Sequence, residues 1–97
     1  MGAPNWSDVT DITSSLNGLN KTYTPTKTGY IYVNAECSGT GALRLEINDS
    51  SSTRFGRYFI AQNDNYIALI PIAAGDTIKT VTRATGVSDS YAFVGAY

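Results

Sequence analysis

The sequence predicts an all-β protein of about eight short antiparallel strands. Runs rich in Tyr, Ile, Val and Phe, which favour strands, recur along the whole chain. Clusters of Gly, Pro, Asn, Asp and Ser separate these runs at fairly even spacing. No segment combines a helical apolar period with good helix-forming residues. The pattern is typical of an antiparallel β-sandwich, a jelly roll or a barrel.

The composition fits one domain with a poorly charged surface. The chain has 97 residues, and no change in composition divides residues 1–97. Hydrophobic residues make up an ordinary 42%, whereas charged residues make up only 15%, against a typical share of about 25%. A surface this poor in charge often belongs to a protein whose assembly buries part of it.

Charge and hydropathy argue against several classes of partner. The net charge is −1 and no basic patch is visible, so we do not expect nucleic-acid binding. No apolar stretch is long enough to span a bilayer, and the first residues lack the pattern of a signal peptide. Cys37 is the only cysteine, which excludes an intramolecular disulfide and favours folding in a reducing cytoplasm.

The first part of the chain is expected to be extended. Residues 1–7 form an arm whose one anchor is Trp6. The spacing of the apolar residues up to Leu19 could be helical, but the Ser, Thr, Asp and Asn residues between them compete with helical hydrogen bonds. We therefore expect a short strand near Asp8–Thr13 and then a loop.

The next segments are predicted as strands with clear boundaries. Lys21–Thr24 precedes a turn at Pro25–Gly29, and Tyr30–Cys37 is strongly strand-like. After a Ser/Gly break, Ala42–Asn48 alternates cleanly. Its inward residues are Leu43, Leu45 and Ile47, and its outward residues are Arg44 and Glu46.

The second half continues the pattern. A polar loop follows Asn48, and residues 53–61 form a strand interrupted near Gly56. Another polar loop, Gln62–Asn65, precedes Tyr66–Ile72, a short isoleucine-rich run that reads as a strand buried on both faces. Gly75 can take the left-handed conformation that a tight turn needs. Thr77–Arg83, a loop at Gly86–Asp89 and a closing strand at Ser90–Tyr97 complete the chain.

Three of these strands, Tyr30–Cys37, Tyr66–Ile72 and Tyr91–Tyr97, carry apolar residues on both faces. One sandwich core can cover only one face of each. If the three strands share a sheet, the outer surface of that sheet is too apolar to face water and marks an interaction site. For the last strand, the outer set is either Tyr91, Phe93 and Tyr97 or Ala92, Val94 and Ala96.

We therefore expect a homo-oligomer that is sealed through this sheet. The predicted interface residues are Tyr30, Tyr32, Tyr66, Ala68, Ile70, Tyr91, Phe93 and Tyr97. The alternative is that loops or the Trp6 arm fold over the same surface within one subunit.

Three segments resemble a known family. Residues 23–33 look like a Pro-x-x-x-Gly-Tyr-aromatic pattern, residues 70–78 like a Leu-x-x-Gly-Asp-x-Val turn, and residues 90–95 like a Ser-x-Phe-x-Gly closing strand. In this order they resemble the trimeric jelly rolls of the complement and tumour-necrosis-factor type. Residues 2–7 are similar to the starts of short bacteriophage tail-fibre and head-fibre proteins built on this module. The chain is shorter than most such modules.

The resemblance implies a homotrimer with jelly-roll topology. The third, sixth and last strands would form the inner sheet around the three-fold axis. It also implies that Ser38–Ala42 is an arch between opposite sheets, whereas a hairpin there would place Glu36 opposite Arg44. The implied location is the virion, after folding in the host cytoplasm, and the fibre works outside the cell.

The residues give little support to catalysis. The chain has no histidine to act as a base for Cys37, no Gly-x-Ser-x-Gly elbow and no phosphate loop. We expect neither a cofactor nor a metal: Asn48, Asp49 and Ser50 are expected to form an ordinary turn rather than a cation site. Glu36 and Glu46 are expected to be solvated strand residues rather than an acid–base pair. The expected protein is not an enzyme.

Binding is more plausible than catalysis. Polar loops with Asn, Asp and Arg can hydrogen-bond sugars, and the best candidate patch contains Arg54, Arg57, Asn63 and Asp64. The alternative is that these loops are ordinary solvated loops. The sequence thus favours a trimeric phage fibre module that contacts a glycan or protein on the host surface. A purely structural trimerisation or capsid-decoration protein without a ligand is the alternative.

Overall fold

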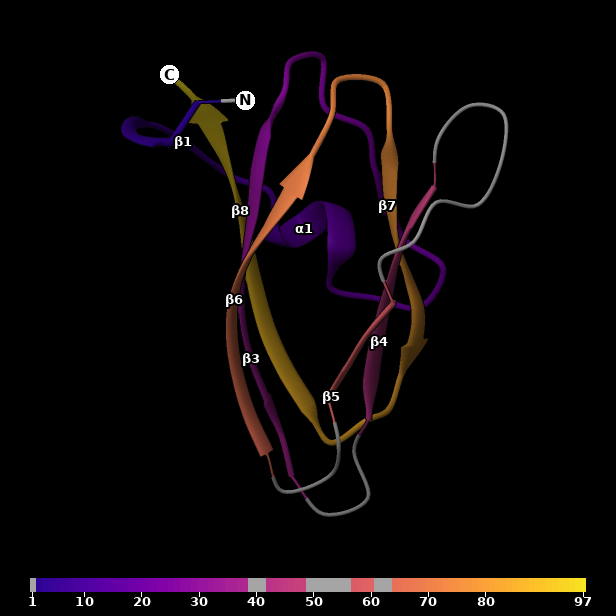
Figure 1. Ribbon diagram of the computed structural model, residues 1–97. Coiled ribbons are helices and arrows are strands. Elements are labelled where there is room, and N and C mark those ends of the chain that lie inside the picture. The colour runs from indigo at the N-terminus through magenta and orange to yellow at the C-terminus, as the bar shows by residue number, and fades with distance from the viewer. Residues whose placement is uncertain (1, 39–41, 49–56, 61–63) are drawn as a thin grey trace.

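The protein is an all-β sandwich of two four-stranded antiparallel sheets (Figure 1). The computed structural model describes residues 2–38, 42–48, 57–60 and 64–97. The first sheet has the order β1-β8-β3-β6 and the second the order β2-β7-β4-β5. The predicted fold class of about eight strands in an antiparallel sandwich is thereby confirmed.

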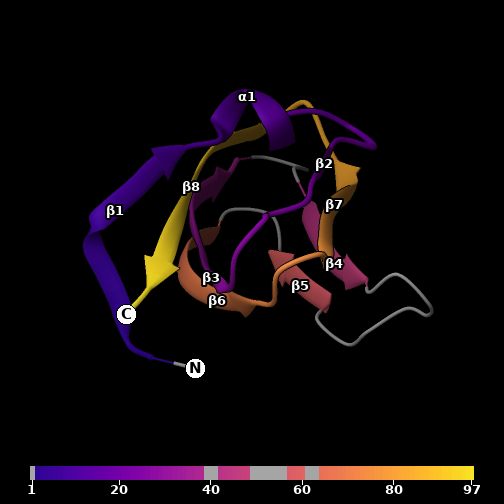
Figure 2. The same cartoon turned by 90° about the horizontal axis from the view of Figure 1, so that it is seen from above.

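Each sheet combines strands from distant parts of the chain. The first contains β1 (Pro4–Asp11), β8 (Val87–Ala96), β3 (Gly29–Cys37) and β6 (Asp64–Ile72). The second contains β2 (Thr22–Tyr23), β7 (Thr77–Arg83), β4 (Leu43–Asn48) and β5 (Arg57–Ile60). A four-residue helix, α1 (Thr13–Leu16), joins β1 to the segment before β2 and lies over an open side of the sandwich, between β8 of the first sheet and β2 of the second (Figure 2).

Strand β3 is the centre of the first sheet. It pairs along its whole length with β6 on one side and with β8 on the other. The three strands that have two apolar faces in the sequence therefore share one sheet, as predicted. β3 and β4 lie in different sheets, which confirms the arch between them and excludes the hairpin that would pair Glu36 with Arg44.

The core lies between the two sheets and draws apolar side chains from both. Its buried members include Ile31 and Val33 of β3, Leu43 and Leu45 of β4, and Ile78 of β7. The strict alternation of buried and half-exposed residues in β4 matches the predicted inward set. Cys37 is buried in this core, as a small apolar residue on a strand face would be.

The connection between β6 and β7 is the glycine turn that the sequence predicts. Gly75 has a φ of +84°, in the left-handed region, and the Asp76 N–H donates a 3.1 Å hydrogen bond to the Ala73 carbonyl. The Gly75 N–H donates to the Pro25 carbonyl at 3.0 Å. These contacts carry the chain from one sheet to the other.

The first 20 residues differ from the prediction. β1 begins at Pro4, inside the expected arm, because Pro4 lies opposite Ala96 at the edge of the sheet. The expected absence of helix is wrong for α1. The Thr13 N–H donates a 2.9 Å hydrogen bond to Asp11 Oδ1, and Ile12 and Leu16 are buried. The polar residues here disfavour a long helix, but Asp11 accepts an N–H at the start of a single helical turn. Burial of Ile12 and Leu16 stabilises that turn.

Candidate functional site

The candidate site is the outer face, meaning the side of sheet β1-β8-β3-β6 that points away from the second sheet. Alternation in β3 directs Ile31 and Val33 into the core and directs Tyr30 and Tyr32 outward. The structure therefore places Tyr30 and Tyr32 on the face where the sequence places them.

The predicted outer residues of β6 are wrong by one position. Ile70 lies opposite Ile31, and cross-strand partners in an antiparallel pair share a side, so Ile70 points into the core. Tyr66 and Ala68 also pack against the core. The outward residues are Ile67, Leu69 and Pro71, which the sequence could equally have supplied because β6 is apolar at almost every position.

The chosen outer residues of β8 are also wrong, and the alternative set is correct. Tyr91 and Phe93 are buried in the core. Ala92, Val94 and Ala96 point outward, because Ala92 lies opposite Tyr32 and Val94 lies opposite Tyr30. Tyr97 follows the end of β8 and is 79% exposed.

Two cross-strand rows make the outer face apolar at the end of the sheet where β3 begins. One row contains Leu69, Tyr32 and Ala92, and the next contains Pro71, Tyr30 and Val94. Farther along the strands the rows become polar, with Asn34 opposite Ser90. Among the described outward residues of β3, β6 and β8, Glu36 alone is charged.

Part of this face is covered by the N-terminal segment (residues 2–8), which runs outside the sheet (Figure 2). The Trp6 ring meets the Tyr32 ring edge to face, with centroids 6.0 Å apart and planes at 83°. The Tyr30 hydroxyl donates a 2.7 Å hydrogen bond to the Gly2 carbonyl. The Tyr97 N–H donates to the Ala3 carbonyl at 2.9 Å.

The segment also crosses the end of β8. Asp8 forms an ion pair with Lys27, and its carboxylate occupies the space that a Cβ on Gly95 would fill. Val94 is fully buried although it points away from the core. The alternative considered from the sequence, an arm that folds over the apolar surface within one subunit, therefore holds for this part of the face.

The contacts of the segment are individually weak. An ion pair with side chains as exposed as Lys27 (57%) and Asp8 (38%) contributes about 0–1 kcal/mol. The edge-to-face pair of Trp6 and Tyr32 contributes about 0.5–1.5 kcal/mol. Residues 5–8 also leave the strand ladder, because the register changes between Pro4 and Val9.

Apolar surface remains on the outer face beside the segment. Ile67 is 66% exposed and Trp6 is 57% exposed. Val9, opposite Val94 in the ladder, is also exposed. Large apolar side chains gathered on one poorly charged face are typical of a surface that contacts another protein.

Comparisons with protein families, with curated proteins and with solved structures give no match. The resemblance to trimeric jelly rolls therefore rests on the short patterns in residues 23–33, 70–78 and 90–95.

Half of the predicted ligand patch lies beyond the described part of the chain. Arg54 and Asn63 are outside the described residues. Arg57 begins β5 opposite Glu46, and Asp64 begins β6 with an exposed side chain.

Within residues 2–38, 42–48, 57–60 and 64–97, no cluster of His, Cys, Asp and Glu could hold a metal ion. No helix in the same ranges is long and apolar enough to cross a membrane.

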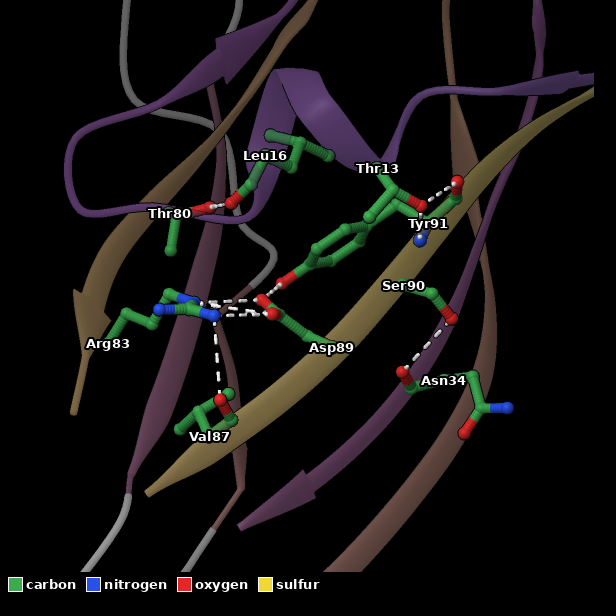
Figure 3. Close-up of polar contacts among 9 residues, drawn as sticks. All are labelled: Thr13, Leu16, Asn34, Thr80, Arg83, Val87, Asp89, Ser90 and Tyr91. Atoms are coloured by element: carbon green, nitrogen blue, oxygen red, sulfur yellow. Dashed lines mark hydrogen bonds and ion pairs between the residues drawn. The ribbon is translucent and has the colours of Figure 1, made fainter. Parts of the chain in front are cut away.

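A polar cluster inside the sandwich joins the two sheets (Figure 3). Arg83 of β7 donates to both carboxylate oxygens of Asp89, through Nε at 3.2 Å and Nη2 at 2.8 Å. The Tyr91 hydroxyl donates to Asp89 Oδ2, and Arg83 Nη2 also donates to the Val87 carbonyl at 3.4 Å. The Asp89 side chain is 1% exposed. An ion pair with this many partners satisfies the buried carboxylate.

This cluster is not among the expectations from the sequence, because Gly86–Asp89 is predicted there to be a loop. The structure begins β8 at Val87. A signal was present, because Asp89 has the same parity as Val87, Tyr91 and Phe93, which are all buried.

The ionisable groups of the core are held in their uncharged or paired forms. Burial, and then the hydrogen bond to Asp89, raises the pKa of the Tyr91 hydroxyl well above its ordinary range. Burial raises the pKa of the Cys37 thiol, and the nearby Asp64 and Asp89 carboxylates add to the effect. A thiol with a raised pKa carries little thiolate and is a poor nucleophile.

Proposed function

We propose that this chain is a non-enzymatic structural module that assembles as a homotrimer through the outer face. The observation that carries the proposal is the pair of apolar rows through Tyr30 and Tyr32, continued at the edge by the exposed Ile67. A second copy of the same face is an apolar surface that could cover these rows.

The strand order supports the trimeric assignment. The first sheet has the order β1-β8-β3-β6 and the second the order β2-β7-β4-β5, so strands from the first and second halves of the chain lie side by side in each sheet. Two Greek keys in one sandwich, as in a jelly roll, produce such an order. The resemblance to trimeric jelly rolls places the sheet that contains the third, sixth and last strands at the three-fold axis. That sheet carries the outer face.

The setting of the proposed trimer follows from the resemblance alone. In this proposal the trimer is part of a fibre on a bacteriophage particle, and the fibre contacts a glycan or protein of the host surface. An array of bacterial glycans tests the recognition role, and Asp64→Ala, at an exposed position in the patch, should weaken any glycan that binds. The structural role does not depend on that result.

The experiment for assembly is sedimentation equilibrium over a range of protein concentrations. The wild-type chain should show three times the subunit mass at micromolar concentration. Ile67→Glu should shift the protein toward the monomer, because the carboxylate would be buried against apolar side chains. A wild-type chain that stays monomeric at high micromolar concentration would refute the proposal.

Thr82→Glu is the matched control. Thr82 is exposed on β7 of the second sheet and lies opposite Arg44. A glutamate there adds the same charge away from the outer face. The control should keep the wild-type mass, and an equal loss of assembly in both variants would show that charge alone, not the outer face, sets the mass.

A further inference from the structure

The N-terminal segment (residues 2–8) occupies the surface that the proposed trimer would use. It covers Tyr30 through the hydrogen bond to Gly2 and contacts Tyr32 through Trp6. In the same two rows, Leu69 is half-buried and Pro71 is exposed beside it. The segment therefore divides one apolar patch into a covered part and an open part.

The segment is attached more firmly at one end than along its length. Val9, Thr10 and Asp11 pair in regular register with β8, and the following Ile12 is buried. Between Pro4 and Val9 the register is lost. The segment is then held by the pairing of Pro4 with Ala96, by the backbone hydrogen bond from the Tyr97 N–H to the Ala3 carbonyl and by contacts of side chains. Val9 is a natural pivot for movement of residues 2–8.

The fixed contacts of the segment are few and partly open to water. The ion pair between Asp8 and Lys27 is solvent-exposed on both sides. Trp6 is more than half exposed to solvent and contacts Tyr32 only through the T-shaped ring pair. A segment with these features can leave the sheet without disrupting the core between the sheets.

We propose that the N-terminal segment is a reversible cover that competes with the neighbouring subunit for the outer face. This inference rests on the proposed homotrimer. When the segment is in place, Tyr30, Tyr32 and Val94 are shielded in the single subunit. When it moves away, these residues join Leu69 and Pro71 in one continuous apolar patch, and a second copy takes the place of the cover. The fraction of open subunits then sets the apparent affinity of assembly.

The chain contains its own reporter of this movement, because Trp6 is the only tryptophan. Quenching of its fluorescence by acrylamide measures how accessible the ring is. The two quantities to compare are this accessibility in dilute protein and the concentration at which half of the subunits are assembled.

Asp8→Lys tests the proposal by replacing the ion pair with two like charges beside Lys27. We expect greater Trp6 quenching in dilute protein and a half-assembly concentration about two- to fivefold lower than that of the wild type. The charge swap Asp8→Lys with Lys27→Asp restores an opposite pair and should return both values toward the wild type.

Trp6→Ala is an independent second variant, because it removes the contact with Tyr32 without changing charge. It should also lower the half-assembly concentration. If either Asp8→Lys or Trp6→Ala leaves assembly unchanged or weakens it, the segment is not a competitor and the inference is overturned. If the wild type and every variant are monomeric at all concentrations, the proposed trimer itself fails, which is a different result.

Discussion

The Tyr91 hydroxyl donates a 2.5 Å hydrogen bond to Oδ2 of Asp89, two positions earlier on the same face of β8. The carboxylate also receives Arg83 from the opposite sheet, so a single buried group joins the two layers of the sandwich. The polar cluster in the core therefore has a structural role that can be measured as stability.

Removing one member of the cluster should be costly. Asp89→Asn keeps the size of the side chain but leaves the partly buried Arg83 without its counter-charge. We expect a loss of about 3 kcal/mol in the free energy of unfolding, measured by urea denaturation at fixed protein concentration. The double variant Arg83→Met with Asp89→Leu should lose less, since apolar residues can replace a buried ion pair. A double variant at least as unstable as Asp89→Asn would contradict this account.

Alkaline pH should destabilise the fold through Tyr91 and Cys37. Burial raises both pKa values in the folded state, so between the unfolded and folded pKa values the native chain binds more protons than the unfolded chain. The protonated Tyr91 and Cys37 therefore make their full contribution to the free energy of unfolding at neutral pH. The contribution of Tyr91 falls as the pH rises above the ordinary tyrosine pKa of 10.0, and that of the Cys37 thiol begins to fall at lower pH. Urea denaturation between pH 7 and pH 11 measures this slope.

Tyr91→Phe separates the tyrosine from the other alkaline titrations. At pH 7 the variant should lose about 1 kcal/mol, because the hydrogen bond to Asp89 is missing. Above pH 10 its stability should fall less steeply than that of the wild type. Equal slopes for the two proteins would show that other groups dominate the alkaline transition.

Two glycines should respond differently to alanine. A Cβ on Gly29 would overlap the Val94 carbonyl oxygen and the Phe93 ring, whereas a Cβ on Gly75 would meet no atom within 4 Å. Gly75→Ala pays only for its positive φ, about 1–2 kcal/mol. Gly29→Ala must displace backbone in the centre of the sheet, and we expect a larger loss, seen as a lower urea midpoint. A smaller effect at Gly29 than at Gly75 would refute the packing argument.

Helix α1 should depend on Thr80. The buried Thr80 hydroxyl donates a 2.7 Å hydrogen bond to the Leu16 carbonyl, at the last residue of the helix. Thr80→Val keeps the shape of the side chain and removes this donor. The Gly18 N–H still donates to the Leu16 carbonyl at 2.8 Å, so we expect a loss of only about 1 kcal/mol. Amide hydrogen exchange of Asn17 and Gly18 should accelerate more than that of Ile31. An equal acceleration of amide exchange over the whole chain would indicate that the variant loses global stability rather than the local stability of α1.

The sequence predicts most of the fold because strand patterns and turns are local properties. Alternation in Ala42–Asn48 determines which side of β4 is buried, and Gly75 marks the turn by a conformation that few other residues adopt. The shared sheet of β3, β6 and β8 was implied by the resemblance to trimeric jelly rolls, and the two apolar faces of each strand agree with it.

The errors at the candidate site have one physical cause. In β6 and β8 both faces are apolar, so alternation cannot show whether Ile70 or Leu69 points inward. Only the register with Ile31 in β3 decides it. The sequence also could not decide whether residues 2–8 cover the sheet, because this depends on a contact between Trp6 and Tyr32, which are distant in the sequence. The buried ion pair of Arg83 and Asp89 likewise depends on contact between two sheets.

One residue of the outer face also affects how the protein behaves when crowded. β6 is the last strand of its sheet, and an uncovered terminal strand is a template for cross-β aggregation. Pro71 lacks the N–H that such pairing requires, and it interrupts the otherwise aliphatic run of β6. Pro71 therefore disfavours open-ended fibrillar growth through this strand and leaves face-to-face packing as the safer mode of association.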